Sequence, residues 1–524
     1  MKLIEGLKLD IGYTQVDLLN AISEKLGINV KDISKYQILK EGLDARRKPN
    51  VHYVLNVAIE TDKTNSATKK LKDIDVYLGG IKELKKLYQG LRPVVVGFGP
   101  SGMFMALKLA KCGYKPIVIE QGDSVDQRLA KVENFWKTGK LDIYSNVHFG
   151  EGGAGTFSDG KLNSNVSNEY CKIVTNELII NGANKEIFYK SKPHIGTDNL
   201  QKIVKNIREE IIRLGGEVRF NTAMVDFTIV DGKVKTVKTQ NTLTNKEDNI
   251  ETSALVLAIG HSAKSVFRLL KQKGVAMEQK PFAMGVRIEQ KQEDINLSQY
   301  GKLDCRLPSA DYKLVEHLDN GRSVFTFCMC PGGVVVASSS EEGTIVTNGM
   351  SYFARDKENA NSAILVNVRC EDYASDDVLA GFDFQEKFER KAFELGGGNY
   401  VAPAQTVGEF LGVEKSNSLN YTYRPNVKFT DLKNCLPDFV YDSIKRALPL
   451  FEKKIKNFAK SCNVLTAIES KSSCPVKVIR GENCSTNILG LYAVGEGAGY
   501  AGGIMSSAQD GLKVAEKVMD YLDN

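Results

Sequence analysis

The chain has 524 residues, a hydrophobic fraction of 42%, a charged fraction of 26% and a formal net charge of +6. Its length allows roughly two to four domains, and so small a charge does not by itself require a nucleic-acid or membrane partner. No apolar run reaches the roughly 20 residues that cross a bilayer, and the N-terminal segment lacks the apolar core of a signal peptide. We therefore expect a cytoplasmic protein with no membrane span. Its ten scattered cysteines should be reduced thiols, because they lack zinc-ligand spacing.

Residues 1–88 are predicted to form a separate small α+β domain. An alternating strand at Leu3–Asp10 precedes a capping box at Thr14, after which apolar residues recur at helical spacing. Two further strands are expected at Tyr36–Leu39 and Val51–Ile59. The turn between them is basic (Arg46, Arg47 and Lys48), and we interpret it as a solvated hairpin tip, with contact to RNA as the alternative.

A dinucleotide-binding βαβ unit is predicted at residues 92–120. Two apolar runs flank the glycine pattern GFGPSG and a helix, and the second run ends in Glu120. Gly97 permits the tight turn, Gly99 lets the backbone approach a pyrophosphate, and Gly102 allows close packing of helix and strand. The carboxylate of Glu120 can bind both ribose hydroxyls, which favours FAD or NAD over NADP. The predicted cofactor contacts of this unit are Gly97, Gly99, Pro100, Ser101, Gly102, Glu120 and Gln121.

Arg128 follows the ribose acid on a polar helix. It is a predicted pyrophosphate contact, with a surface salt bridge as an equal alternative.

The segment 146–163 interleaves five glycines with polar and apolar side chains. Such a backbone can lie against a flat or phosphorylated ligand, because glycine permits close approach. A flexible linker is the alternative. The predicted cofactor contacts in this segment are Gly153, Gly155, Thr156 and Ser158.

The nucleotide domain is expected to continue to residue 280. An amphipathic helix at Asp198–Leu214 precedes strands and a hairpin that include Met224. The apolar strand SALVLAIG then ends near Ala258 and Gly260, at the edge of a parallel sheet where ligands bind. We interpret His261 as a polar loop residue, with a catalytic base as the alternative.

The pattern changes at about residue 281. Long strands of a mixed sheet predict an inserted substrate domain at 281–474, and residues 475–524 return to the nucleotide domain that began at 89–280. There the segment GEGAGYAGGI feeds a final helix.

These motifs resemble the uncharacterised bacterial FAD-dependent dehydrogenases, a family of NAD(P)/FAD-dependent oxidoreductases distantly similar to geranylgeranyl reductases and electron-transfer-flavoprotein dehydrogenases. The resemblance is carried by GFGPSG, FGEGGAGTFSDGKL, KPHIGTD, AIGHSA, FAMGVRIE, FTFCMCPGG and GEGAGYAGGI. It implies an α/β fold with a two-dinucleotide-type, Rossmann-like FAD-binding domain. It also implies that the backbone at Met224 meets the adenine, and that the C-terminal segment binds the ribityl chain and the flavin. The contacts implied in that segment are Gly495, Glu496, Gly502, Gly503 and Ile504, with Glu496 where aspartate is commoner.

Three side chains are candidates for catalysis. Cys328 and Cys330 lie on a predicted strand, where residues two apart share one face. They can act as a redox pair or supply a reactive thiolate, with two buried core residues as the alternative. Lys161 can place a positive charge near the flavin, or it can form a local ion pair with Asp159. Arg287 can bind an acidic substrate group or be an ordinary sheet cation.

The sequence thus predicts an FAD-dependent oxidoreductase that acts on a small organic molecule. NADH or NADPH is a possible transient electron donor. The alternatives are a flavoprotein that acts on RNA through the basic N-terminal turn and a non-catalytic FAD-binding protein. We expect no nucleic-acid partner, and the substrate and oligomeric state are left open.

Overall fold

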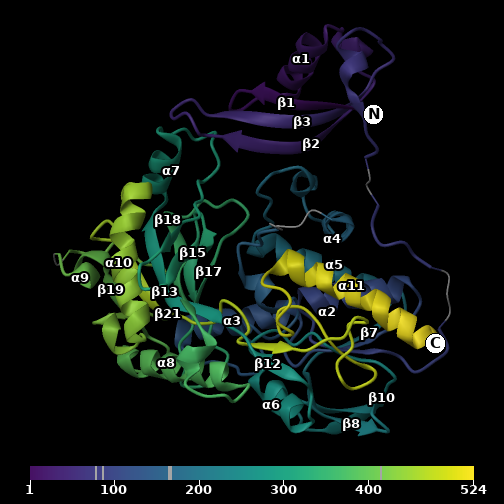
Figure 1. Ribbon diagram of the computed structural model, residues 1–524, viewed down its shortest axis with the longest axis vertical. Helices are drawn as coiled ribbons and strands as arrows, with labels where there is room; N and C mark the ends of the chain where they lie inside the picture. The colour runs from purple at the N-terminus through teal and green to yellow at the C-terminus, as the bar shows by residue number, and fades with distance from the viewer. Residues whose placement is uncertain (77–78, 85–87, 163–167, 414–415) are drawn as a thin grey trace.

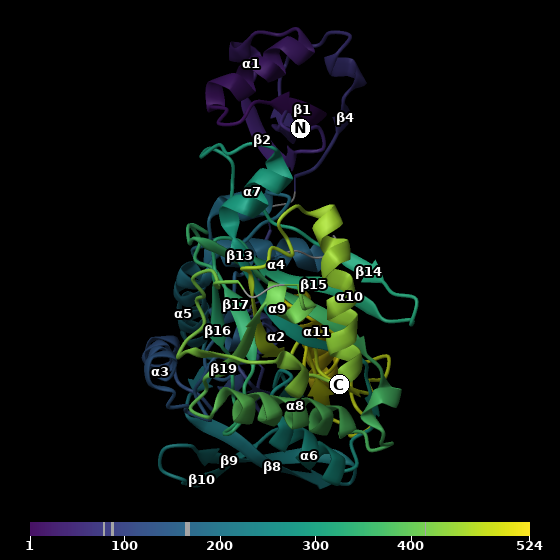
Figure 2. The same ribbon diagram turned by 90° about the vertical axis from the view of Figure 1, so that its left-hand side faces the viewer.

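The computed structural model describes residues 1–524 apart from 77–78, 85–87, 163–167 and 414–415. Three main sheets organise the chain: a small N-terminal sheet, a parallel sheet and a larger mixed sheet. Figures 1 and 2 place the N-terminal sheet at one end of the long axis, above the other two. The predicted fold class is confirmed: the molecule is α/β, with a Rossmann-type parallel sheet and an additional mixed sheet.

The N-terminal sheet has the strand order β2-β3-β1-β4 and is covered by helix α1 (Gln15–Leu26). Helix α1 begins at the predicted capping box, in which Thr14 and Asp17 bond each other's backbone N–H groups. The sheet joins the rest of the protein through Glu41, whose backbone bonds Tyr189 and Ser191 at 2.8 Å each. The strands are β1 (Lys2–Leu9), β2 (Lys35–Asp44), β3 (His52–Glu60) and β4 (Lys72–Asp73).

The parallel sheet has the order β23-β11-β5-β6-β7, in which every pair runs parallel. Helices pack on one face, and an antiparallel meander at residues 222–251 packs with the helix at 264–272 on the other, so the central strands are almost wholly apolar and buried. The strands are β5 (Val94–Val96), β6 (Ile117–Ile119), β7 (Glu217–Arg219), β11 (Leu255–Leu257) and β23 (Leu491–Ala493). The helices around it include α2 (Pro100–Lys111), α3 (Val125–Thr138), α4 (Glu169–Ile180), α5 (Thr197–Arg213) and α11 (Ile504–Asp523).

Helices α2 and α11 lie side by side and pack at very short range (Figure 1). A Cβ atom added at Gly511 of α11 would lie 2.3 Å from the Ser101 carbonyl oxygen of α2. Glycine at this crossing therefore brings these two helices beside the parallel sheet together, with their N-termini at the same side of the sheet.

An antiparallel meander continues from the parallel sheet and precedes helix α6 (Lys264–Gln272). Its strands are β8 (Thr222–Val230), β9 (Lys233–Asn241) and β10 (Glu247–Glu251).

The larger sheet is mixed, with the order β14-β15-β18-β13-β21-β19-β20 and one parallel pair, β19 with β20. Helix α10 (Asp438–Lys454) packs along one face of its central strands (Figure 2). The strands are β13 (Phe282–Lys291), β14 (Val315–His317), β15 (Ser323–Cys330), β18 (Asn359–Val368), β19 (Ala402–Thr406), β20 (Val427–Phe429) and β21 (Val464–Glu469). Further elements here are α7 (Gln292–Tyr300), α8 (Ala380–Gly396), α9 (Val407–Leu411) and the hairpin β16 (Val334–Ala337) with β17 (Thr347–Met350).

A two-stranded ribbon connects the two larger sheets. Strand β12 (Met277–Gln279) pairs antiparallel with β22 (Val476–Val478), so the chain leaves the parallel sheet and returns to it at neighbouring points. The mixed sheet is therefore an insertion, and the space between the two sheets receives residues from both.

No helix in the described part of the chain is long and apolar enough to cross a membrane.

Candidate functional site

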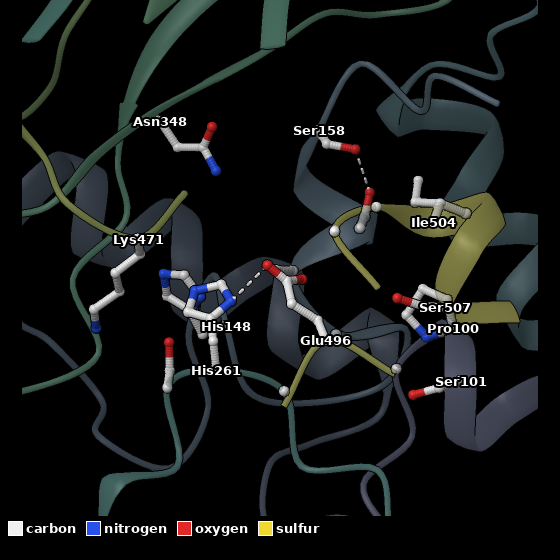
Figure 3. A pocket seen from close by; sticks show the side chains of 18 of the residues that line it. Pro100, Ser101, His148, Ser158, His261, Asn348, Lys471, Glu496, Ile504 and Ser507 are labelled. Carbon is white, nitrogen blue, oxygen red and sulfur yellow. Dashed lines mark hydrogen bonds and ion pairs between the residues drawn. The ribbon is translucent and has the colours of Figure 1, made fainter. Parts of the chain in front are cut away.

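A cavity of about 350 Å³ lies between the parallel and the mixed sheet (Figure 3). Both sheets line it, and so does the glycine-rich segment 146–163. The predicted site residues on its wall are Gly97, Gly99, Pro100, Ser101, Glu120, Gly153, Gly155, Ser158, Lys161, Ala258, Gly260, Cys328, Glu496, Gly502, Gly503 and Ile504. Sequence segments that lie as far apart as Gly97 and Ser507 thus meet at one site.

Two glycines at the turn after β5 have no room for a side chain. A Cβ at Gly97, whose φ is +97°, would lie 2.4 Å from the Ala258 carbonyl oxygen. A Cβ at Gly102 would lie 2.1 Å from the Gly97 carbonyl oxygen. Gly102 itself is buried beneath the turn, so it shapes the site without lining it.

Glu120 ends β6 and is 5% exposed. Its carboxylate accepts hydrogen bonds from the backbone N–H groups of Phe98 (2.9 Å), Gly122 (3.0 Å) and Gly150 (2.9 Å). These bonds fix the carboxylate at the junction of the main cavity and a neighbouring cavity of about 280 Å³. Met224 and Gln121 line that second cavity.

Two helix N-termini open into the main cavity without a side-chain cap. Helix α2 begins after Gly99 and helix α11 after Gly503. A Cβ at Gly502 or Gly503 would meet no atom within 4 Å. The free N–H groups and positive dipole ends of both helices therefore point at space that an anionic or polar ligand can fill.

Arg128 lies under the glycine-rich segment rather than in the cavity. Its guanidinium is fully buried and donates to the carbonyl oxygens of Asn146 (2.8 Å), Val147 (2.9 Å) and Glu151 (2.6 Å). Both expectations for Arg128, a pyrophosphate contact and a surface salt bridge, are corrected here: the side chain is saturated by loop carbonyls, and it holds the loop in place.

The other predicted residues off the cavity wall also have internal partners. Thr156 is buried and donates to the Glu151 carbonyl oxygen at 3.3 Å. The N–H group of Gly495 donates to Asp510 at 2.8 Å.

Phe157 of the glycine-rich segment packs edge-on against Trp136, with ring centroids 5.9 Å apart, and the Trp136 indole N–H bonds the Ala337 carbonyl oxygen at 2.9 Å. The glycine-rich segment is thus anchored to the mixed-sheet domain.

A histidine pair borders the cavity, as Figure 3 shows. His261 Nδ1 lies 3.1 Å from the Glu496 carboxylate, and the ring of His148 stands edge-on to that of His261 at 5.3 Å. His261 is 9% exposed, and its Nε2 atom has no protein partner. Ser262 Oγ is likewise buried and unpartnered. Burial, Lys471 and His261 lower the pKa of His148 well below its usual value, so this ring is neutral near pH 7.

FAD fits these residues on structural grounds. The wall offers two uncapped helix N-termini, a buried ribose-type carboxylate, and two buried polar atoms that lack a partner. A long, polar ligand with an anionic middle satisfies all of them, and the two adjoining cavities give it length.

The two cysteines do not lie on a regular strand, which corrects the expectation that they share one face. The pairing of β15 with β18 shifts between Phe327 and Cys330, forming a β-bulge. Cys328 has a φ of +42° within the bulge and lines the cavity, whereas Cys330 is fully buried. All ten cysteines are free thiols in this structure.

Cations hold the backbone of this bulge. Arg287 donates to the Cys328 carbonyl oxygen at 2.7 Å, and Lys161 donates to that of Met329. The Cys330 thiol lies 3.4 Å from the Cys328 carbonyl oxygen. A hydrogen bond from the Cys330 thiol, with the charges of Lys161 and Arg287, holds the pKa of Cys328 well below its usual value. The pKa of Cys330 is raised by the same hydrogen bond and by burial.

Arg287 is fully buried and saturated by protein groups, so it does not face a substrate. Its guanidinium also contacts Glu469 at 3.2 Å and Asn361 at 3.2 Å. Lys161 forms the expected ion pair with Asp159 at 3.1 Å, and Asp159 is bound in bidentate fashion by Arg355.

Glu469 and Lys471 are site residues that the sequence interpretation missed. Both follow or end the buried strand β21 and line the main cavity. Burial raises the pKa of Glu469 to about 7, although Arg287 opposes that shift. Burial lowers the pKa of Lys471, whose Nζ donates to Ser340 at 2.8 Å. The available signal was an acid that ends an apolar strand in the segment VLTAIESKSS.

Family models, solved structures and a curated relative resemble this chain. A family model described as "FAD-dependent protein, C-terminal domain-like" matches residues 281–472, and a "Domain of unknown function (DUF8436)" matches residues 1–60. Among solved structures, a flavoprotein/dehydrogenase from Cytophaga hutchinsonii is similar with a TM-score of 0.39 and 9% identity, covering 83% of this chain and 79% of that one. A variant of E. coli quinol fumarate reductase gives a TM-score of 0.37 and 11% identity, covering 83% of this chain and 70% of that one.

An uncharacterised protein of Clostridium beijerinckii is 47% identical over 532 residues, covering 99% of each chain. With this relative and the matched C-terminal domain, the chain belongs to a family of FAD-dependent proteins.

Proposed function

We propose that the protein is an oxidoreductase that transfers hydride or electrons between bound FAD and a small organic substrate. The observation that carries the proposal is one cavity with two different ends. One end has helix N-termini and Glu120, which suit a dinucleotide. The other end has Cys328, Glu469 and Lys161, whose thiol, carboxyl and amine can take part in a reaction of the substrate.

The FAD contacts that we propose begin with the glycine turn and Glu120. Met224 and Gln121 border the adenine, and the N-terminus of α11 meets the flavin ring. FAD supplies the hydride or electron transfer when it is bound. The positive end of α11 stabilises negative charge that develops in the cavity beside Gly503 and Ile504.

Three side chains of the mixed-sheet end are proposed to act on the substrate. Glu469 can hold or release a proton near neutral pH, because its pKa lies at about 7. Cys328 presents a thiolate to the cavity, and Lys161 balances its charge. Cys330 is buried behind the cavity wall, so its proposed part is to support the Cys328 thiolate and not to touch the substrate.

The alternative of an RNA-directed flavoprotein is not favoured. Arg46 of the basic turn pairs with Asp44 at 2.6 Å, and Lys48 donates to the Ser298 carbonyl oxygen. Two of the three cations of this turn are therefore engaged with the protein itself. A non-catalytic FAD-binding protein is also disfavoured, because a passive site does not need an ionised thiol and a titrating carboxyl on its wall.

Anaerobic spectroscopy of the purified protein tests the proposal. We expect yellow protein with about one FAD per chain, whose flavin absorbance bleaches with NADH, NADPH or fractionated metabolites as donors. Colourless protein that binds no added FAD contradicts the proposal, as does flavin that stays oxidised with every donor fraction. Glu482→Gln, an exposed change outside the cavity, is the control that retains wild-type behaviour.

A further inference from the structure

The Cys328–Cys330 pair has features that two buried core cysteines do not need. Cys328 adopts a left-handed backbone conformation, which a non-glycine residue keeps only where its surroundings enforce it. Arg287 and Lys161 supply that enforcement by binding the two carbonyl oxygens inside the bulge. The strain is therefore maintained by buried charge, at the wall of the FAD-type cavity.

The bulge brings the two thiols together. The Cys330 side chain folds back toward Cys328, so that its sulfur lies 3.4 Å from the Cys328 carbonyl oxygen. The Cys330 thiol is also the largest influence that lowers the pKa of Cys328, in agreement with two side chains that lie beside each other in the bulge. A thiolate beside a thiol is the arrangement from which dithiol–disulfide exchange starts.

The electrostatic surroundings favour the reduced, ionised form. Lys161 and Arg287 both face the pair, while Asp159 is already neutralised by Arg355 and Lys161. A disulfide across one intervening residue closes a small strained ring, and strained disulfides are the readily reduced ones. The pair is thus suited to switch between two redox states rather than to stabilise the fold as a permanent disulfide.

We propose that Cys328 and Cys330 form a reversible redox centre that exchanges two electrons with the bound FAD. This rests on the proposed function. In the reductive direction the S–S bond breaks, and the pair takes two electrons and one proton from reduced FAD, which becomes oxidised. Cys330 receives the proton as a thiol, and Cys328 leaves as a thiolate beside Lys161. The reverse step forms the S–S bond and returns the two electrons and the proton, so no third reactant is needed.

Anaerobic reductive titration with dithionite tests this proposal on FAD-loaded, fully oxidised protein. The wild type should consume about twice as many reducing equivalents per FAD as Cys330→Ser or Cys328→Ser. Counting thiols in denaturant should find two fewer in the oxidised than in the reduced wild type. Neither serine variant should show that difference.

Cys171→Ser is the matched control, because Cys171 is also half-buried but lies on α4, and it should behave as the wild type. The FAD absorbance and the urea midpoint of each variant verify that it is folded, and the Cys328 and Cys330 variants check each other.

The outcomes separate the two proposals. Wild-type protein whose flavin bleaches with the same number of equivalents as the serine variants, and whose thiol count does not change, overturns the redox pair alone. Protein that binds no FAD overturns both the pair and the proposed function. If Cys330→Ser still consumes twice the reducing equivalents per FAD, the redox pair is also overturned, because another group then stores the electrons.

Discussion

The turn after β5 and the bulge in β15 face the same cavity but are built differently. Around Gly97 and Gly102 the determinant is space, because an added Cβ would lie 2.4 Å or less from a backbone oxygen. Around Cys328 the determinant is charge, because Arg287 and Lys161 hold the backbone and set the thiol's ionisation. The cofactor end should therefore fail when atoms are added, and the chemical end when charges are removed. Each prediction below tests that separation.

The largest effect is expected from removing the buried cation of the chemical end. Arg287→Met leaves Glu469 buried without its partner, which should lower the free energy of unfolding by about 3–5 kcal/mol. Adding Glu469→Gln should recover most of that loss, because the unpaired carboxyl is then gone. Urea unfolding measures both. The exposed side chain of Arg306, which pairs with Asp304, gives the control Arg306→Met, which should change stability by less than about 1 kcal/mol.

A comparable but different failure is expected at the cofactor end. Gly102→Ala forces a Cβ against the Gly97 carbonyl oxygen, a strain of about 3 kcal/mol that corresponds to roughly 100-fold weaker FAD binding. Fluorescence titration of the apoprotein with FAD measures it. Gly481→Ala, where the nearest atom would be 3.4 Å away, should bind FAD normally. Wild-type affinity in Gly102→Ala would mean that space is not the determinant.

The pH dependence of stability should reveal Glu469. Its folded-state pKa of about 7 exceeds the ordinary value of 4.5, so the folded protein holds this proton more tightly than the unfolded chain. That stabilisation is fully present below pH 4.5 and is lost as the pH rises through 7. The wild type should therefore lose about 2–3 kcal/mol relative to Glu469→Gln across this window. A pH-independent difference between the two proteins contradicts this assignment.

The smallest effect concerns the charge beside the thiol. Lys161→Met should slow alkylation of Cys328 by iodoacetamide at pH 5 about fivefold, because losing the nearby positive charge raises the pKa of Cys328 from about 5 and reduces the thiolate fraction at that pH. Peptide mass spectrometry gives the rate, with Cys171 in the same sample as an internal reference. Lys161→Arg should restore most of it. An unchanged rate in Lys161→Met would show that Arg287 and Cys330 alone sustain the thiolate.

The same contrast explains what could be predicted from sequence. The proposed cofactor end is local: Gly97 to Glu120 form one βαβ unit, and the segment 495–504 is a second continuous turn, so sequence alone could single out both parts of the cavity wall. Arg128 was placed wrongly because its carbonyl partners lie in a loop whose path the sequence does not specify.

The chemical end depends on pairing between distant strands. The bulge at Cys328 exists only through the register of β15 against β18, and Arg287 meets Glu469 across 182 residues of sequence. The alternation of residues within one strand carries no information on the register between strands or on contacts across the sheet. Glu469 was therefore missed, and Cys328 was expected on a regular strand.

Trp136 gives the molecule an intrinsic optical reporter. It is the chain's single tryptophan, and it connects Phe157 of the glycine-rich segment to Ala337 of the inserted domain. Its emission overlaps flavin absorption, so energy transfer will quench it when the site is loaded. Displacement of the glycine-rich segment will change the polarity around the indole and shift the wavelength of its emission maximum. The protein's own fluorescence can therefore follow cofactor loading and loop position in one recording, without any attached label.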